Sequence, residues 1–216
     1  MPTHFAVLGD IHAAWGQVKK AVYRYPDIPI RSVGDMGFGF PYEKRAKGRW
    51  VPDLAKCDPA EFPANFKFIR GNHDSPEGCR AHPNYLGDYG VDAETGLFFY
   101  SGAMSSDSAR RTAGIDWWAE EELSMAEASR AITLYEQTKP AIVLSHDCPA
   151  LLRHYLVSHH QADQSRTAQA LDAMLEIHAP ALWIFGHHHK VWQKKIGGTL
   201  FVCAAINQTL KFPLSA

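Results

Sequence analysis

Five short patches of metal-ligand residues follow one another along the chain. The patches are Asp10-Ile11-His12, Gly34-Asp35, Gly71-Asn72-His73-Asp74, Ser145-His146 and Gly186-His187-His188-His189. Each patch comes directly after an apolar run that predicts a β-strand. Open α/β sheets build their sites at the carboxyl ends of strands, so we expect the patches to converge at one sheet edge. The seven ligand-type side chains found there are enough for two metal ions.

Imidazole nitrogens and carboxylate oxygens are the usual protein ligands of divalent transition metals. Two such ions about 3.5–4 Å apart can share a bridging carboxylate and clamp a phosphoryl group, whose phosphorus a shared hydroxide then attacks. Such a site also needs a nearby proton donor. The mixed ligands predict two divalent or trivalent transition-metal ions as cofactors, with Mn, Fe or Zn expected.

The elements that must position these patches can be predicted from the apolar pattern. Strands are expected at 5–8, 30–33, 66–69, 97–100, 141–144 and 182–185. Helices are expected at about 15–25, from a capping box at Ser124 and Glu127 to about residue 137, and at 165–178. Gly197-Gly198-Thr199, between apolar runs at 191–196 and 200–204, indicates a hairpin. Strands that alternate with helices predict a layered α/β sandwich.

The whole chain, residues 1–216, is expected to form a single domain. A segment at about 36–64 is rich in Gly, Pro and aromatic residues and has no clear periodicity. Unstructured loops of this length usually have a function, so it is predicted to be a functional loop insertion.

The composition is that of an ordinary globular protein, with 46% hydrophobic and 21% charged residues. The net charge of −1 provides no global basic field to recruit nucleic acid, although a local basic patch remains open. Four cysteines without a C-x-x-C pair argue against a zinc ribbon. There is no membrane-length apolar run and no signal-peptide pattern, so no membrane partner and a cytoplasmic location are expected.

In their order and spacing, the five patches resemble the calcineurin-like metallophosphoesterase superfamily, in particular its small bacterial and phage-type members. The pattern of that family is D-x-H, G-D, G-N-H-[DE], a lone His and G-H-x-H, and it extends here from Asp10 to His189. The resemblance implies an α/β fold, a four-layer α/β/β/α sandwich of two mixed β-sheets flanked by helices, with the metals at the strand carboxyl ends. It further implies a binuclear metal-dependent hydrolase of phosphomonoesters or phosphodiesters, whose phosphate-ester substrate could be a nucleotide.

The resemblance also implies seven metal ligands, divided into two sets with one bridge between them. The first set is Asp10, His12 and His189, the second is Asn72, His146 and His187, and the bridge is Asp35.

Three further residues receive roles from the resemblance. His73 would protonate the leaving oxygen of the substrate, and Asp74 would orient His73 and raise its basicity. Arg70 would bind phosphate oxygens through its planar guanidinium group. His188 lies between two ligands, and alternation along an extended backbone would turn its side chain away from the metals.

Other residues leave two interpretations open. The aromatic residues Phe38, Phe40, Tyr42 and Trp50, with the pair Trp117-Trp118, could stack a nucleobase or pack loops against the sandwich. Arg110 and Arg111 could reach a phosphate or be ordinary exposed arginines. Asp147 could support His146 or be a solvated loop residue.

Three functional alternatives follow from these observations. The Asp-Arg-Gly that follows Gly-Asp in phosphoprotein phosphatases and dinucleoside tetraphosphatases is missing after Asp35, which argues against those specific activities. A nuclease or cyclic-nucleotide phosphodiesterase remains an alternative within the same chemistry. A catalytically inactive protein-binding scaffold is the alternative of another class, and the complete set of ligands together with His73 argues against it. The oligomeric state is not indicated by the sequence.

Overall fold

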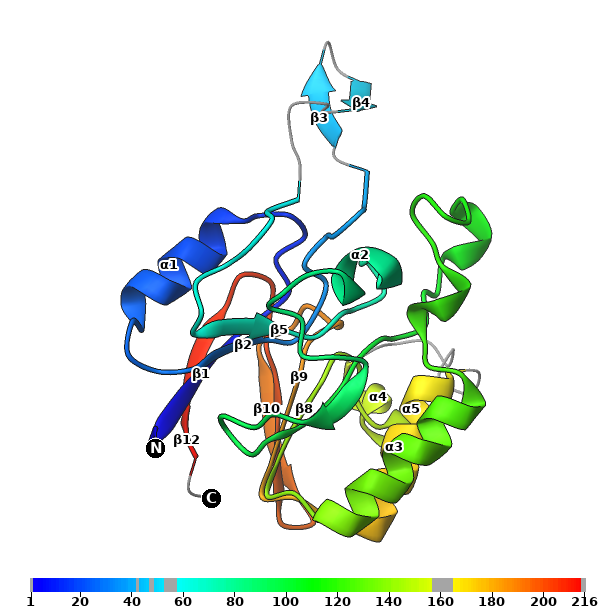
Figure 1. The fold of residues 1–216 in the computed structure, drawn as a ribbon. Helices are drawn as coiled ribbons and strands as arrows, with labels where there is room; N and C mark the ends of the chain where they lie inside the picture. The colour runs from blue at the N-terminus through cyan, green and yellow to red at the C-terminus, as the bar shows by residue number, and fades with distance from the viewer. Residues whose placement is uncertain (1, 42, 47–48, 53–57, 157–164, 215–216) are drawn as a thin grey trace.

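The computed structural model describes residues 2–41, 43–46, 49–52, 58–156 and 165–214. Two mixed β-sheets lie against each other and carry helices on their outer faces (Figure 1). The first sheet has the order β12 (Thr209–Pro213), β1 (His4–Leu8), β2 (Ile30–Ser32) and β5 (Phe66–Phe68). The second sheet has the order β10 (Trp192–Ile196), β11 (Thr199–Cys203), β9 (Leu182–Phe185), β8 (Ile142–Ser145), β7 (Phe98–Tyr100) and β6 (Tyr89–Val91).

Parallel pairing joins the strands that precede the five patches. β1, β2 and β5 are parallel neighbours in the first sheet, and β8 and β9 are parallel neighbours in the second. Three edge strands, β12, β6 and β10, run antiparallel to their neighbours. The carboxyl ends of the parallel strands are therefore free to carry polar loops, as in other α/β sheets.

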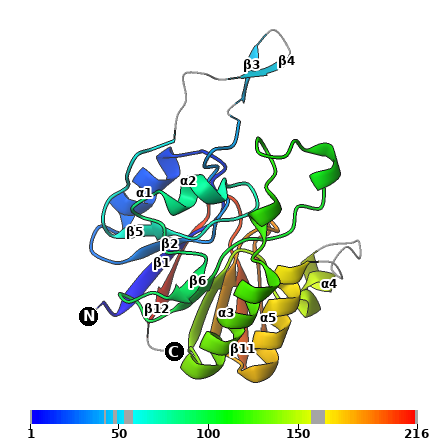
Figure 2. The ribbon, with the colours of Figure 1, turned by 45° about the vertical axis from the view of Figure 1, so that its right-hand side comes forward.

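Helices cover the outer face of each sheet, as Figure 2 shows from a second direction. Helix α1 (Gly16–Arg24) packs on the first sheet, whereas α3 (Met125–Thr138) and α5 (Arg166–Ile177) pack on the second. The short helices α2 (Pro76–Arg80) and α4 (Arg153–Leu156) lie in the loops. The predicted four-layer α/β/β/α sandwich of two mixed sheets is confirmed.

Alternation along the strands divides the core into three apolar layers. In β1, Phe5 and Val7 face the second sheet, while Ala6 and Leu8 face α1. Successive side chains of a strand point to opposite faces, so a strand buried on both sides reads as one continuous apolar run. Such runs made β1 predictable from the sequence.

Helix α3 begins where the sequence predicts. The Ser124 hydroxyl accepts a hydrogen bond from the Glu127 backbone N–H, and the Glu127 carboxylate accepts one from the Ser124 backbone. This capping box satisfies two backbone donors that the first turn of a helix leaves unpaired. The helix ends at Thr138 and is capped by Lys139, which has a left-handed conformation with φ of 41°.

Several elements differ from the sequence-based predictions. The 36–64 segment, predicted as a loop, contains the antiparallel strands β3 (Glu43–Ala46) and β4 (Arg49–Pro52). Figure 1 shows these two strands apart from the main sheets. Tyr42 and the side chain of Trp50 lie outside the described residues. The strands β6 and β12 and the helix α2 were not predicted, because each is short and none presents an uninterrupted apolar run.

A buried ion pair between Arg31 and Asp92 joins the two sheets. Arg31 on β2 is fully buried, and its Nε donates to Oδ2 of Asp92, just after β6, over 2.8 Å. Its Nη2 also lies 2.6 Å from Oε2 of Glu94. Burial alone would raise the pKa of Asp92, but the Thr95 hydroxyl and the Arg31 charge outweigh burial and lower it. The first sheet is thus tied to the β6–β7 turn of the second.

Among the described helices, none combines the length and apolar character that a membrane crossing requires.

Candidate metal centre

The structure brings the seven predicted ligand side chains together at the carboxyl ends of five strands. Asp10 follows β1, Asp35 follows β2, Asn72 follows β5, His146 follows β8, and His187 and His189 follow β9, while His12 completes the first patch. Both sheets contribute, so this arrangement exists only when the two sheets are packed together.

Asp10, His12, Asp35 and His189 form the first group of possible ligands. Their ligand atoms all lie within 4.8 Å of one another. The Nε2 atoms of His12 and His189 are 3.1 Å apart, and Nε2 of His189 is 3.2 Å from Oδ2 of Asp10. Two imidazole nitrogens that face each other at this distance need a shared proton or a shared cation between them.

Asp35, His146 and His187 form the second group, again with ligand atoms within 4.8 Å of one another. Oδ1 of Asn72 joins this group, at 3.1 Å from Nε2 of His146 and 3.0 Å from Nδ1 of His187. Asp35 belongs to both groups: its Oδ1 lies 3.3 Å from Nε2 of His146 and its Oδ2 lies 3.7 Å from Nε2 of His12. A carboxylate in this position can contact two ions at once.

The electrostatics of the centre fit a bound cation. Asp10 and Asp35 are buried, and Oδ1 of Asp10 has no hydrogen-bond partner among the described residues. Burial alone would raise the pKa of Asp35, but His146, His73 and His12 together hold it well below the usual range. Burial opposes protonation of His146, yet the carboxylates of Asp35 and Asp10 raise its pKa to about 10. The buried carboxylates therefore require positive charge, which transition-metal ions would supply.

Backbone strain is concentrated on the ligand residues. His12, Asp35, His187 and His189 have positive φ values of 42°, 45°, 63° and 56°. Residues other than glycine rarely adopt this conformation, which costs roughly 1–3 kcal/mol each and persists where the surroundings enforce it. Four strained residues among seven possible ligands indicate that the loops are shaped to point these side chains inward.

Close backbone approach explains two glycines of the patches. A Cβ atom on Gly71 would lie 2.1 Å from Oδ1 of Asp35, and one on Gly186 would lie 2.3 Å from Oδ1 of Asp10. Both distances are far shorter than van der Waals contact. The glycines before Asn72 and His187 thus leave room for the two carboxylates.

Hydrogen bonds outside the two groups orient the ligand side chains. Nδ1 of His146 donates to the Val33 carbonyl over 2.7 Å, which leaves Nε2 to face Asn72. Nδ2 of Asn72 donates to Oγ of Ser105 over 3.0 Å, and Ser105 in turn donates to Glu121. Supporting contacts of this kind fix the tautomer and direction of metal ligands. The sequence assigned no individual role to Ser105 or Glu121, which lie in a loop that carries no ligand.

His188 points away from both groups. Its Nε2 lies 3.1 Å from Oδ1 of Asp147 and 3.3 Å from Sγ of Cys148. These three residues are close enough to resemble a further ligand group. However, Arg153 pairs with Asp147, and burial raises the pKa of the Cys148 thiol. Protein partners therefore satisfy this cluster.

His73 lies beside the two groups and belongs to neither. Its backbone N–H donates to Oδ1 of Asp35 over 2.8 Å, and its ring centroid is 5.0 Å from that of His12. Nη2 of Arg111 lies 2.9 Å from Nε2 of His73, and the Phe40 ring packs 4.8 Å from the imidazole, centroid to centroid. Burial lowers the pKa of His73 to about 4, Asp35 opposes this shift, and Arg111 lowers the pKa further.

Asp74 has a different set of contacts from the one that the resemblance implied. Its carboxylate accepts four hydrogen bonds, all from backbone N–H groups: those of Met36, Gly37, Phe38 and Gly71, over 3.1, 2.7, 3.0 and 2.8 Å. None of these bonds goes to the His73 ring, and the orienting role stays a prediction. Asp74 holds in place the backbone that follows Asp35 and the backbone that precedes Asn72. Burial and the charge of Asp35 raise its pKa to about 6, against the effect of its hydrogen bonds.

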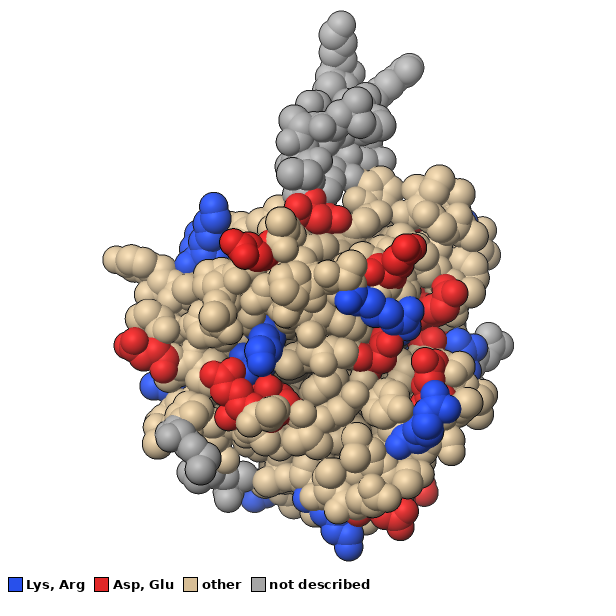
Figure 3. Space-filling view, viewed as in Figure 1, with Lys and Arg blue, Asp and Glu red and all other residues tan. Residues whose placement is uncertain are grey.

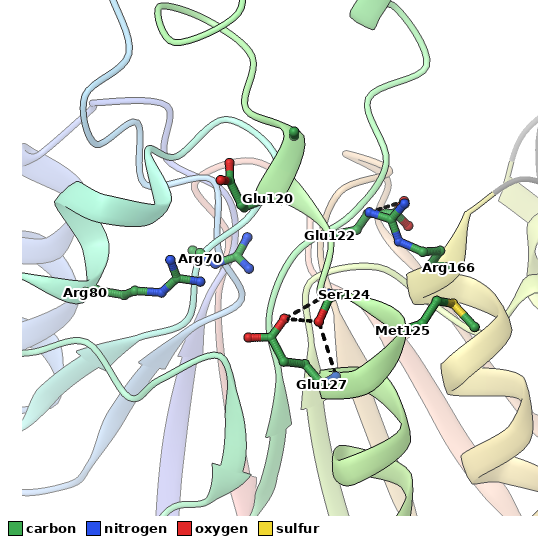
Figure 4. A pocket seen from close by; sticks show the side chains of 9 residues that line it. Arg70, Arg80, Glu120, Glu122, Ser124, Met125, Glu127 and Arg166 are labelled. Carbon is green, nitrogen blue, oxygen red and sulfur yellow. Dashed lines mark hydrogen bonds and ion pairs between the residues drawn. The ribbon is translucent and has the colours of Figure 1, made fainter.

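Arg70 is directed to protein partners. The side chain is 1% exposed, its Nε donates to Oδ1 of Asp88 over 2.7 Å, and its Nη1 donates to the Glu121 carbonyl over 2.8 Å. It lines a separate pocket of about 470 Å³. Figure 4 shows Arg70 and Arg80 at one side of this pocket, with Ser124 and Glu127 at the start of α3. The geometry thus gives Arg70 a structural ion pair, which the motif position alone could not indicate.

The aromatic residues that the sequence left open divide into two kinds. Phe38 is a core residue stacked on Phe68, with ring centroids 5.0 Å apart. Phe40 instead lies between His73 and Trp118, whose ring centroid is 5.9 Å away. Phe40, Trp118 and Arg111 therefore form one side of the centre. No local motif marks them, because loops distant in sequence bring them together.

A family model for calcineurin-like phosphoesterases matches residues 3–191. No curated protein is significantly similar in sequence. Several solved structures are similar, among them two that share the fold. TT1561 of Thermus thermophilus is 11% identical, with 99% of this chain and 100% of that chain covered and a TM-score of 0.55. GAP50, the anchor in the inner membrane complex of Plasmodium, is 12% identical, with 94% and 71% covered and a TM-score of 0.52. On the family match, which spans most of its length, the chain belongs to the calcineurin-like phosphoesterases.

Proposed function

We propose that the chain is a metal-dependent phosphoesterase that hydrolyses phosphomonoesters or phosphodiesters with two transition-metal ions. The observation that carries the proposal is the position of Asp35, which belongs to both ligand groups. Asp10, His12 and His189 would hold one ion, Asn72, His146 and His187 would hold the other, and Asp35 would bridge the two. The metal-dependent family to which the chain belongs supports this proposal.

The ions, when bound, would neutralise charge on the phosphoryl group and lower the pKa of a water molecule. The protein side chains supply the rest. Asp35 and Asn72 fix the ligand spacing, and Asp74 stabilises the loops that carry both residues. His73 lies next to the ligand groups and outside them, and its low pKa leaves the ring neutral near pH 7. The negative charge of a bound phosphate would raise that pKa, so that the imidazolium could give a proton to the leaving oxygen of the substrate.

Charge distribution favours a small phosphate ester over a nucleic acid. The net charge is −1, and Figure 3 shows Lys and Arg side chains interspersed with Asp and Glu on the face that it presents. Proteins that bind nucleic acid usually gather basic residues into one patch or stripe. The cytoplasmic location and the single domain spanning residues 1–216 stay predictions.

The proposal can be tested with protein loaded with Mn²⁺ and assayed on p-nitrophenyl phosphate and bis(p-nitrophenyl) phosphate. Asp35→Asn removes the bridging charge. Loss of a residue that only supports a metal ligand lowers activity by up to about 100-fold, so we expect the loss of activity in Asp35→Asn to be larger than that. Asp27→Asn, at an exposed aspartate, is the matched control and should keep full activity. Near-normal turnover by Asp35→Asn with full metal content would contradict the bridging role.

A further inference from the structure

Arg111 reaches the candidate metal centre from a part of the chain that carries no ligand. It lies in the long loop between β7 and α3, just after the 3₁₀ turn Ser108–Arg110. Figures 1 and 2 show this green loop rising above the carboxyl ends of the strands. Nη2 of Arg111 lies 2.9 Å from Nε2 of His73, and the guanidinium carbon lies 5.7 Å from the centroid of the Phe40 ring.

The guanidinium group is held in place by its own loop. Nη2 also lies 2.8 Å from Oδ1 of Asp107, and Nη1 donates to the Asp116 carbonyl over 3.3 Å. The Arg111 side chain is only 10% exposed. The loop is anchored in turn by Ser105, which joins Asn72 to Glu121. A preorganised cation of this kind can bind an anion without losing further conformational entropy.

The position of this cation calls for an anionic ligand. One imidazole ring, that of His73, separates Arg111 from His12, where a metal ion would add positive charge. Asp107, which is half exposed on the same loop, already pairs with this guanidinium, and an anion bound between Arg111 and the centre would further offset the repulsion between Arg111 and the bound cations. Arg70, whose motif position suggested this role, is directed to Asp88 and the Glu121 carbonyl, whereas Arg111 contacts His73 beside the ligand groups. Arg111 is therefore the arginine placed to contact a substrate at the centre.

We infer that Arg111 binds a phosphate oxygen of the substrate and makes the enzyme prefer phosphomonoesters to phosphodiesters. The inference rests on the proposed function and names the substrate class for it. A monoester has three non-ester oxygens and carries about two negative charges near neutral pH. Two of these oxygens can face the ligand groups while the third faces Arg111. A diester has only two non-ester oxygens, so an uncharged ester oxygen would have to lie against the guanidinium.

The test compares Arg111→Gln and Arg111→Lys with Arg110→Gln, at the exposed neighbouring arginine, all loaded with Mn²⁺. We measure kcat/KM on p-nitrophenyl phosphate and bis(p-nitrophenyl) phosphate, the binding of inorganic phosphate by calorimetry, and the metal content. Arg111→Gln should lower kcat/KM on the monoester by about 10–100-fold, the range for a hydrogen bond to a charged group. It should weaken phosphate binding by a similar factor, change the diester far less and leave the metal content intact. Arg111→Lys should recover part of the loss, and Arg110→Gln should match the wild type.

Two results would overturn the inference while leaving the proposed function in place. Equal losses on both esters with unchanged phosphate binding would mean that Arg111 supports His73 and does not contact phosphate. Wild-type kinetics of Arg111→Gln on the monoester would remove Arg111 from the site. If the wild type hydrolysed neither ester, the proposed function would fail, and phosphate binding by the metal-loaded variants would still decide whether Arg111 binds the anion.

Discussion

His73 is surrounded by Arg111, Phe40 and the backbone of the metal-ligand loops. Its ring belongs to neither group of possible metal ligands. We predict that His73→Ala keeps both metals and loses activity in a way that depends on the leaving group. Protonation of a departing oxygen is typically worth ~10²–10⁴-fold in rate, and p-nitrophenolate needs that proton least. Alkyl or nucleoside monoesters should therefore lose far more activity than p-nitrophenyl phosphate.

Kinetics on a series of monoesters with graded leaving groups, together with elemental analysis, checks this prediction. His154→Ala, at an exposed histidine, provides the control. A uniform loss across the series would show that His73 positions the phosphate and does not supply a proton. Loss of metal would show that it is a ligand.

Asp74 is predicted to act on the centre through the backbone. Replacement by Asn leaves one side-chain oxygen to accept from four backbone N–H donors. The amide NH₂ group takes the place of the second oxygen and faces N–H groups that need an acceptor. A buried donor without an acceptor costs about 1–3 kcal/mol. We expect Asp74→Asn to lower the urea midpoint and to weaken Mn²⁺ binding by calorimetry, with equal losses on all esters. A loss confined to poor leaving groups would instead restore its role as a partner of His73.

At the residue scale, the motifs predicted which side chains would converge but not every contact they make. Asp35 and Asn72 each follow an apolar run and a glycine, a pattern that predicts the end of a strand. Because the ends of parallel strands lie side by side, the two side chains could be expected to lie close together. The neighbours of His73 depend on the path of the β7–α3 loop, and no periodicity encodes that path. For this reason Arg70 and Arg111 could not be told apart from the sequence.

At the element scale, the pair between Arg31 and Asp92 is expected to hold the two sheets in register. Removal of one partner of a buried pair costs up to about 3–5 kcal/mol, and here Glu94 remains as a second, partly exposed partner of Arg31. We predict that Asp92→Ala lowers the free energy of unfolding by up to this amount at pH 7, measured by urea denaturation. Glu94→Gln is the control: Glu94 contacts the same arginine but is 40% exposed, and such surface pairs contribute about 0–1 kcal/mol.

The sign of the pH dependence supplies a second check on this pair. The pKa of Asp92 is lowered in the folded chain, so its contribution is present above the unfolded pKa of about 3.9 and is lost as pH falls below it. The difference in unfolding free energy between the wild type and Asp92→Ala should therefore shrink from pH 5 toward pH 3. A constant difference would assign the effect to packing and not to charge.

Elements with continuous apolar runs could be predicted from the sequence, and elements at the margins could not. β1, β8 and β9 are buried on both faces, so their apolar residues form continuous runs that predict strands. β12 and β6 lie at sheet edges and are partly exposed, and their mixed sequences resemble those of loops. β3 pairs with β4 but contains Glu-Lys-Arg, so its sequence has no apolar run that would predict a strand.

At the scale of the whole molecule, the centre lies where two sheets meet. Three ligand-bearing strands belong to the first sheet and two to the second. Four ligand residues have strained backbones, and two carboxylates are buried. Both features raise the free energy of the folded chain at the centre, and bound cations would offset this destabilisation. Metal binding should therefore be coupled to the stability of the entire sandwich.

The last prediction concerns that coupling. An ion that binds only the folded chain stabilises it by about 2.7 kcal/mol when its free concentration is one hundred times its dissociation constant. Chelation should thus lower the melting temperature, and Mn²⁺ should restore it in two steps that match an uptake of two ions in calorimetry and elemental analysis. Asp35→Asn should reduce the rise in melting temperature in both steps, because Asp35 belongs to both groups. Asp10→Asn should chiefly remove the step that belongs to the first group. Uptake of a single ion, or a melting temperature that does not respond to Mn²⁺, would contradict a centre built across the two sheets for a pair of ions.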